Sequence, residues 1–196
     1  MIDERLKQQL EFLIEADKLK QILRRTVLTD GSRRENDAEH SWHVALFAMI
    51  LREYAADAID MRRVLEMAMV HDMVEIYAGD TFAYDASGNQ TKLEREMQAA
   101  DKLFALLPED QAKTYRALWE EYDAEETPDA RFAASLDRLQ PLIHNYLTGG
   151  HTWKLGDVKP AQTYKRVAPL EKAAPQLWEV ADQIIQDSIK KGYIKP

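Results

Sequence analysis

Hydrophobic residues recur at spacings of three and four along almost the whole chain, which is the repeat that gathers side chains on one face of an α-helix. No alternation of Val, Ile and Thr typical of strands continues for more than a few residues, and glycine and proline number only seven each. We therefore expect an all-α protein. The expected helices are residues 3–24, about 36–54, 61–78, 93–107, 112–122 and 129–147, a short helix between Pro160 and Pro169, and a last one through Leu177, Val180, Ala181, Ile184 and Ile185.

Turn-forming residues separate these helices. Residues 27–34 and 81–89 are polar and contain glycine, so we expect loops there. The sequence from Asn36 to Glu39 is typical of a capping box, in which the side chains at the two ends of a first helical turn bond each other's backbone. Gly79 is expected to end the helix before it, and residues 149–153 are expected to form a flexible loop.

The size and charge of the chain narrow the classes of function. It has 196 residues, of which 45% are hydrophobic, and a formal net charge of −8. This length fits one domain, residues 1–196, with enough residues to bury a substantial core. A strongly acidic chain without a basic, aromatic-rich patch is not expected to bind nucleic acid or a membrane surface. Any anionic substrate must meet a local positive patch or a metal ion.

The absence of cysteine excludes disulfides, thiolate metal ligands and cysteine nucleophiles. Residues 1–5 are followed by no apolar run, so we expect no signal peptide. No window of the sequence approaches the length and hydrophobicity of a membrane span. We expect a cytoplasmic protein.

Reactive side chains are concentrated between Val70 and Asp80. His71 and Asp72 are adjacent, Glu75 follows at helical spacing, and Asp80 comes directly after a glycine. Residues three and four apart share a helix face, so His71, Asp72 and Glu75 are expected to line one wall of a pocket. A histidine by itself is more often a structural residue than a ligand, and the adjacent aspartate changes that balance only modestly.

Two residues on other predicted helices complete a set of potential metal ligands. His40 precedes His71 by 31 positions, and Asp137 follows Asp72 by 65. Two histidines and two carboxylates suit Mn²⁺, Co²⁺, Zn²⁺ or Fe²⁺ and leave room for water on the ion. We expect one divalent ion per chain.

This combination of motifs resembles the HD-domain metal-dependent phosphohydrolases. Within that superfamily the chain is most similar to the YfbR-type 5′-deoxynucleotidases and the HD-domain-containing protein 2 group. The resemblance runs from about Leu10 to Asn145, and the order and spacing of its motifs make it specific. The matching motifs are Ala38-Glu39-His40-Ser41, Val70-His71-Asp72-Met73-Val74-Glu75, Gly79-Asp80 and Leu136-Asp137-Arg138.

The residues after His71-Asp72 distinguish the branches of the superfamily. Many deoxynucleoside triphosphatases and cyclic-nucleotide phosphodiesterases carry a second histidine at the position of Glu75. Alarmone hydrolases have Glu-Asp where this chain has Glu75-Ile76, and the cyclic-di-guanylate branch has His-Asp-x-Gly-Lys. The pattern His-Asp-x-x-Glu followed by Gly-Asp is that of the nucleotidase branch.

The resemblance implies roles for these residues. His40, His71, Asp72 and Asp137 would bind the metal, as their residue types also suggest. Glu75 would orient or deprotonate a water whose pKa the ion lowers. Asp80 would lie near the leaving 5′-oxygen, either as a general acid or as a group that holds the water.

Four arginines lie between the first predicted helix and His40. Arg25 occupies the position of a family arginine that contacts phosphate, and Arg33 is a second basic position, so both are expected to bind substrate. We interpret Arg24 and Arg34 as solvent-exposed neighbours. Thr26 stands where the bacterial family members have a tryptophan tied to how the sugar is held, so selectivity for deoxyribose is left open.

Further residues near these motifs have structural interpretations. His144 follows Asp137 by seven positions and is a spare candidate ligand, which we interpret as structural. His43 lies one turn from His40 and is a candidate to support it. Pro141 is expected to kink its helix beside Asp137. Trp153 either stacks on a base or, as is commoner, anchors a loop.

Together the motifs predict a single HD domain with its metal and catalytic residues within about 36–147 and C-terminal helices, about 160–192, packed on the core. The resemblance implies a homodimeric hydrolase of deoxynucleoside 5′-monophosphates. The alternatives are an enzyme for another small phosphate ester, such as a ribonucleotide or a non-nucleotide metabolite, and a non-catalytic metal or nucleotide sensor. Retention of both Glu75 and Asp80 favours an enzyme.

Overall fold

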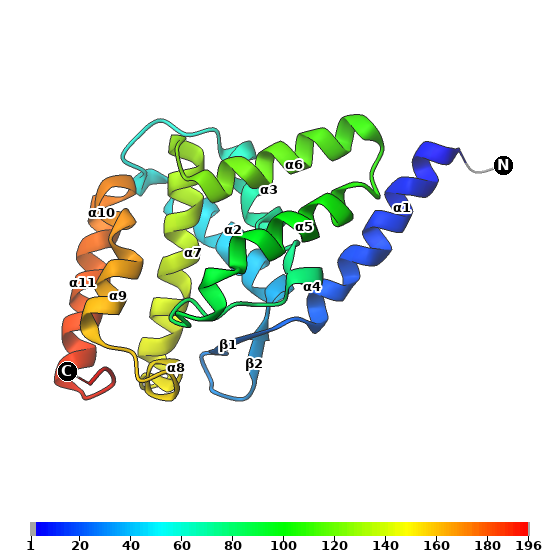
Figure 1. Cartoon of the computed structure of the whole chain (residues 1–196). Helices are drawn as coiled ribbons and strands as arrows, with labels where there is room; N and C mark the ends of the chain where they lie inside the picture. The colour runs from blue at the N-terminus through cyan, green and yellow to red at the C-terminus, as the bar shows by residue number, and fades with distance from the viewer. Residues whose placement is uncertain (1–2, 196) are drawn as a thin grey trace.

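The computed structural model describes residues 3–195, and these form a helical bundle with a small hairpin at one end (Figure 1). The all-α prediction is confirmed. In chain order the elements are α1 (Glu4–Ala16), η1 (Asp17–Gln21), β1 (Leu23–Val27), β2 (Arg34–Asn36), α2 (Asp37–Leu51), η2 (Arg52–Tyr54), α3 (Met61–Val70), α4 (Glu75–Ala78), η3 (Gly88–Gln90), α5 (Lys92–Phe104), α6 (Glu109–Ala124), α7 (Pro128–Leu147), α8 (His151–Leu155), α9 (Pro160–Val167), α10 (Pro169–Ala173) and α11 (Pro175–Lys190).

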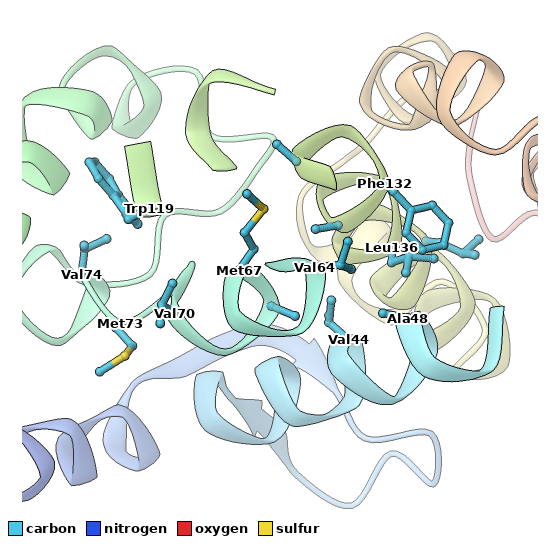
Figure 2. Close-up of a cluster of buried hydrophobic side chains, with 14 of the residues drawn as sticks. Val44, Ala48, Val64, Met67, Val70, Met73, Val74, Trp119, Phe132 and Leu136 are labelled. Carbon is cyan, nitrogen blue, oxygen red and sulfur yellow. The ribbon is translucent and has the colours of Figure 1, made fainter. Parts of the chain in front are cut away.

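The centre of the bundle is the packing of α2, α3 and α7 against one another. Figure 2 shows that these three helices bring together Val44, Val64, Met67 and Leu136, each almost completely buried. The C-terminal helices α9, α10 and α11 pack on the other side of α7 and add to the same core. Because α2, α3 and α7 each carry a motif identified in the sequence, their packing determines the geometry of the site.

The N-terminal segment differs from the prediction of one helix over residues 3–24. The α-helix ends at Ala16, a 3₁₀ turn follows as η1, and Ile22 is already extended, with φ −82° and ψ 119°. Strand β1 begins at Leu23 and pairs with β2, and the loop expected over 27–34 connects the two strands at residues 28–33. Helical periodicity in residues 17–22 does not indicate a following strand that is paired with residues 7 to 13 positions away.

Arg34 connects the two strands from its side chain. Its guanidinium donates to the backbone carbonyl oxygens of Leu23 and Arg24 across the hairpin. The strand β2 leads directly into α2, and the predicted capping box is confirmed there. The Asn36 side chain accepts from the backbone N–H of Glu39, and the Glu39 carboxylate accepts from the backbone N–H of Asn36. The start of α2, and with it the position of His40, is therefore specified locally.

The predicted helix over 61–78 is interrupted. Helix α3 ends at Val70, a tight turn follows, and α4 begins at Glu75. The turn is closed by bonds of the i→i−3 type, such as that from the Glu75 backbone N–H to the Asp72 carbonyl oxygen at 2.9 Å. Such bonds align residues three apart. Gly79, with φ 75°, ends α4 as expected.

The segment after α7 is ordered as helix α8 where we had predicted a loop. Gly150 adopts φ 76°, and a Cβ at this position would come within 2.5 Å of the Tyr193 carbonyl oxygen. Trp153 is buried, at 2% exposure, which agrees with its interpretation as an anchor. Within residues 3–195, no helix combines the length and apolar character that crossing a bilayer requires.

Candidate active site

Four side chains from three parts of the chain meet at the centre of the bundle. His40 comes from α2, His71 and Asp72 from the turn after α3, and Asp137 from the middle of α7. His40 Nε2 lies 2.8 Å from Asp137 Oδ1 and 3.8 Å from Asp72 Oδ2. His71 Nε2 lies 3.2 Å from Asp72 Oδ2 and 3.7 Å from Asp137 Oδ1. The structure therefore brings together all four residues expected to bind metal.

These separations match those of ligands around one ion. Ligand atoms about 2.1 Å from a metal are roughly 3.0–3.4 Å apart in octahedral or tetrahedral geometry. Ligand atoms of His40, His71 and Asp72 all lie within 4.8 Å of one another, and Asp137 Oδ1 lies within 3.7 Å of the Nε2 atoms of both histidines. His71 Nε2 is buried and has no hydrogen-bond partner among the described residues. A buried nitrogen without a partner is costly unless it has a ligand, so the four residues fit a metal ion.

The Nδ1 atoms of both histidines have hydrogen-bond partners that leave Nε2 for a metal ion. His71 Nδ1 lies 2.9 Å from the Ala68 carbonyl oxygen, which can only accept, so Nδ1 carries a proton and Nε2 is the nitrogen that would bind an ion. His40 Nδ1 lies 3.2 Å from Gln140 Oε1, so Nδ1 donates there and Nε2, hydrogen-bonded to Asp137 Oδ1 at 2.8 Å, is the nitrogen that would bind an ion. Such partners commonly orient metal-binding histidines.

The charges around the cluster favour a cation. Burial opposes ionisation of Asp72 and Asp137, but neighbouring His71, His40 and arginines hold the pKa of both carboxyls below the ordinary value. Burial also opposes protonation of His71, yet Asp72 and Asp137 raise its pKa to about 10. The surrounding charges therefore favour a positive charge at the position in front of His71 Nε2.

A second group of carboxyls adjoins the cluster. Ligand atoms of Asp37, Glu75 and Asp80 lie within 4.8 Å of one another. Burial, followed by the charges of Asp72 and Asp37, raises the pKa of Glu75 well above its ordinary value. Burial also raises the pKa of Asp80, and burial together with Asp72 raises that of Asp37 to about 7. Carboxyls with raised pKa values suit proton transfer near neutral pH.

Arg24 is part of the site, and its interpretation as a solvent-exposed neighbour is wrong. Its side chain is only 14% exposed, and its Nη1 donates to Asp72 Oδ2 at 2.7 Å and approaches Asp37 Oδ1 at 3.4 Å. Strand β1 carries it there, so the hairpin that helical periodicity did not predict is also what brings this cation to the carboxylates.

Arg25 and Arg33 are placed differently. Arg25 lines the cavity in front of the carboxylates, with its guanidinium 4.7 Å from the ring centre of Phe82. Arg33 is 53% exposed and forms a bidentate pair with Glu39, and it does not line the cavity. The structure therefore does not bring Arg33 to the site. Arg34 remains at the hairpin edge.

The cavity has a volume of about 190 Å³ and opens onto the carboxylates. Tyr122 and Trp153 provide aromatic walls, and Thr26 lies at its edge with its hydroxyl donating to Glu35 at 3.3 Å. Arg166 of α9 also lines it and donates to Asp137 Oδ2 at 3.2 Å. This pocket offers cations and flat apolar surfaces next to the ligand cluster, as a phosphate ester with an aromatic base requires.

Several of these residues escaped the sequence analysis. Asp37 precedes His40 by three positions and Gln140 follows Asp137 by three, so helical spacing from a ligand was an available signal for both. Arg166 lies in a distant helix, and no spacing connects it with the motifs. His43 and His144 both contact Gln140, behind His40.

Comparison with known proteins identifies the family. The family model described as HD domain matches residues 16–178. The human protein named 5′-deoxynucleotidase HDDC2 is 32% identical over 135 residues, which cover 68% of this chain and 65% of the human protein. The protein named 5′-deoxynucleotidase hdd1 of Schizosaccharomyces pombe is 28% identical over 165 residues, covering 82% of this chain and 73% of that protein.

Solved structures show the same fold. A predicted metal-dependent phosphohydrolase of Magnetospirillum magnetotacticum superposes with a TM-score of 0.94 at 52% identity, over 98% of this chain and 96% of that one. A conserved hypothetical protein of Pyrococcus furiosus has a TM-score of 0.61 at 22% identity over 90% of this chain and 99% of that one, a likeness of fold. With the ligand cluster and the matched family model, these similarities lead to one conclusion. The chain belongs to the HD domain family.

Proposed function

We propose that this protein is a metal-dependent phosphohydrolase that converts deoxynucleoside 5′-monophosphates to deoxynucleosides and phosphate. The observation that carries the proposal is that His71, Asp72 and Asp137, with His40 packed against them, line one cavity together with Glu75 and Asp80. The human and fission-yeast relatives are named 5′-deoxynucleotidases, although the chain spans about 65% of the human protein. The fold and these carboxyls support the same reaction class.

We propose that His40, His71, Asp72 and Asp137 hold one divalent ion, of the group Mn²⁺, Co²⁺, Zn²⁺ or Fe²⁺. When bound, such an ion polarises a phosphoryl oxygen and lowers the pKa of a water toward neutrality. Glu75 Oε2, which is buried without a hydrogen-bond partner among residues 3–195, accepts the proton of the attacking water. Its raised pKa makes it a stronger base than an ordinary carboxylate.

Asp80 lies past Gly79, at the edge of the same cavity. Its raised pKa favours the protonated carboxyl, which can donate to the leaving 5′-oxygen of the nucleoside. Holding the attacking water is the second role open to it. One experiment distinguishes the two roles. A general acid is needed least when the leaving group is good. If Asp80 is the acid, Asp80→Asn should therefore lose less activity, relative to the parent protein, on a p-nitrophenyl ester than on a nucleotide.

The cation proposed to bind the phosphate is Arg25. We expect Arg25→Ala to raise KM for a nucleoside monophosphate by roughly 10- to 100-fold, since a charge-assisted hydrogen bond is worth about 1.5–3 kcal/mol. Arg33→Ala is the matched control, because Arg33 is near in sequence but outside the cavity. Steady-state kinetics of both variants check this. Equal KM values for the two would remove Arg25 from the substrate site.

The substrate is best tested by phosphate release from a panel of deoxy- and ribonucleoside mono-, di- and triphosphates with several metals. We expect deoxynucleoside monophosphates to give the highest kcat/KM. Thr26 is small and bonded to Glu35, so it blocks the sugar less than the family tryptophan. Ribonucleotides are therefore the nearest competitors. Hydrolysis of only non-nucleotide esters would favour the alternative substrate class, and no hydrolysis at all would favour a sensor.

We also propose that the protein is a cytoplasmic homodimer. Helix α2 exposes Trp42, Leu46, Met49 and Ile50 at 37–66%, and these residues share one face of the helix. Ile50→Glu is expected to shift the protein from dimer to monomer in light scattering, because it buries a charge in the contact. Leu155→Glu, at a similarly exposed residue on α8, is the control. A monomeric parent protein would contradict the proposal.

A further inference from the structure

Gln140 connects the proposed metal site with a second buried cluster. It lies on α7, one turn after Asp137, and its side chain is fully buried. One end of its amide faces His40, and the other faces Glu35, His43 and His144. These three residues come from β2, α2 and α7, and no catalytic role in the proposed reaction uses them.

The Glu35 side of the cluster determines which way the amide points. Gln140 Nε2 lies 2.7 Å from Glu35 Oε1, 3.1 Å from His144 Nε2 and 3.2 Å from His43 Nδ1. An ionised carboxylate can only accept hydrogen bonds, so the NH₂ group must face it. Glu35 is 2% exposed and also accepts from Thr26. Turning the amide round would set two buried oxygens against each other at hydrogen-bond distance.

The two histidines support the same orientation. Burial lowers the pKa of both His43 and His144, so neutral rings offer lone pairs to the NH₂ group. Glu35, His43 and His144 offer three acceptors to Gln140 Nε2, which has only two hydrogens. The amide therefore donates to Glu35 and to one histidine at a time. Because Gln140 Nε2 fills the space between Glu35, His43 and His144, this cluster orients the amide and leaves no room there for an ion.

The other end of the amide then specifies the state of His40. With the NH₂ group directed at Glu35, Oε1 faces His40 Nδ1 at 3.2 Å. An oxygen acceptor at this place holds a proton on Nδ1, so Nε2, which is hydrogen-bonded to Asp137 Oδ1 at 2.8 Å and lies 3.8 Å from Asp72 Oδ2, is the nitrogen left to bind an ion. Glu35 Oε2, at 3.8 Å from His40 Nδ1, is too far to substitute for it.

We propose that Gln140 is a positioning residue: held in one orientation by Glu35, His43 and His144, it keeps His40 in the tautomer that binds the metal and so sets the affinity of the site. This inference rests on the metal site proposed above. It predicts that residues with no contact to metal or substrate control how tightly the ion is held.

The test compares the affinity of four proteins for Co²⁺, measured by chelator competition together with the visible absorption of the bound ion. Gln140→Leu keeps the size of the side chain and removes the acceptor, and we expect about 10- to 100-fold weaker binding. Gln186→Leu, the same change at an exposed residue of α11, is the control and should bind as the parent does. The melting temperature of each metal-free protein is recorded in parallel.

The fourth protein exchanges the two side chains, Glu35→Gln with Gln140→Glu. The exchange preserves charge and volume, and it keeps an oxygen acceptor for His40 Nδ1–H and a bond between residues 35 and 140. Binding should return to within about threefold of the parent, with the parent's spectrum. If Gln140 were merely structural, the loss of Co²⁺ affinity would parallel a loss in melting temperature, and the exchange would not restore the affinity.

Unchanged Co²⁺ affinity in Gln140→Leu would overturn the inference, as would an exchange variant that binds no better than Gln140→Leu. Should Gln140→Leu not fold, Glu35→Gln decides, because it frees the amide to turn: weaker binding supports the inference and unchanged binding overturns it. The readout does not depend on turnover. A parent protein that binds Co²⁺ but hydrolyses no phosphate ester would contradict the proposed activity and leave this inference standing.

Discussion

Replacing Asp72 with alanine is expected to abolish both metal binding and phosphatase activity. Asp72 Oδ2 lies within 3.8 Å of both histidine Nε2 atoms, so its loss removes one of the four ligands and half of the cluster's negative charge. The remaining ligands would hold an ion far less tightly. We expect kcat/KM to fall by roughly 10³-fold or more, equivalent to about 4 kcal/mol of barrier.

Metal analysis of protein purified without chelators measures the first effect. The parent protein should contain about one transition ion per chain and Asp72→Ala almost none. Asp123→Ala is the matched control, because Asp123 lines the same cavity at an exposed position and is not one of the proposed ligands. A variant at Asp72 that retains its ion, or hydrolyses normally without one, would show that the metal site has been assigned to the wrong residues.

The second large effect is expected for Glu75→Gln, which should keep the metal and lose activity. Glu75 is not one of the four ligands, and its Oε2 has no hydrogen-bond partner among the described residues. Removal of a general base typically costs 10²- to 10⁴-fold. Co²⁺ affinity should change little, and kcat should fall within that range. Glu96→Gln is the control, since Glu96 is also buried at the cavity but pairs with Lys92 at 3.5 Å.

The pH profile gives this prediction a second readout. A carboxyl with a raised pKa stays protonated to higher pH, and only its ionised form can take a proton from water. The log of kcat/KM in the parent should therefore rise with pH on the acid side, and this limb should disappear in Glu75→Gln. If Glu75→Gln and Asp80→Ala both hydrolyse substrate normally, the proposed mechanism is wrong.

Helical periodicity was sufficient to predict most of the bundle, because each amphipathic helix contains its own signal. The capping box at Asn36 was predictable for the same reason, since its partners are three residues apart. The hairpin of β1 and β2 was not, because each strand is stabilised by residues beyond the reach of a local pattern. Periodicity also does not reveal the break after Val70, because His71 and Val74 keep helical backbone angles and the turn between them differs in its hydrogen bonds, which span three residues instead of four.

The residues of the site likewise differ in whether a pattern along the sequence indicates them. His40, His71, Asp72 and Asp137 were found because order and spacing along the chain carry the motif. Arg24 was misjudged since its burial depends on the hairpin.

By itself, then, the sequence determined the helical class, the family and the four residues that we propose as ligands, because these depend on local periodicity and on residue types at given spacings. The tertiary structure alone decided which cations reach the carboxylates and how the ligands are oriented. Arg24 enters and Arg33 stays outside because the hairpin turns only one of them inward. The state of His40 depends on Gln140 and Glu35, residues 105 positions apart whose contact exists only when α7 packs behind β2 and α2.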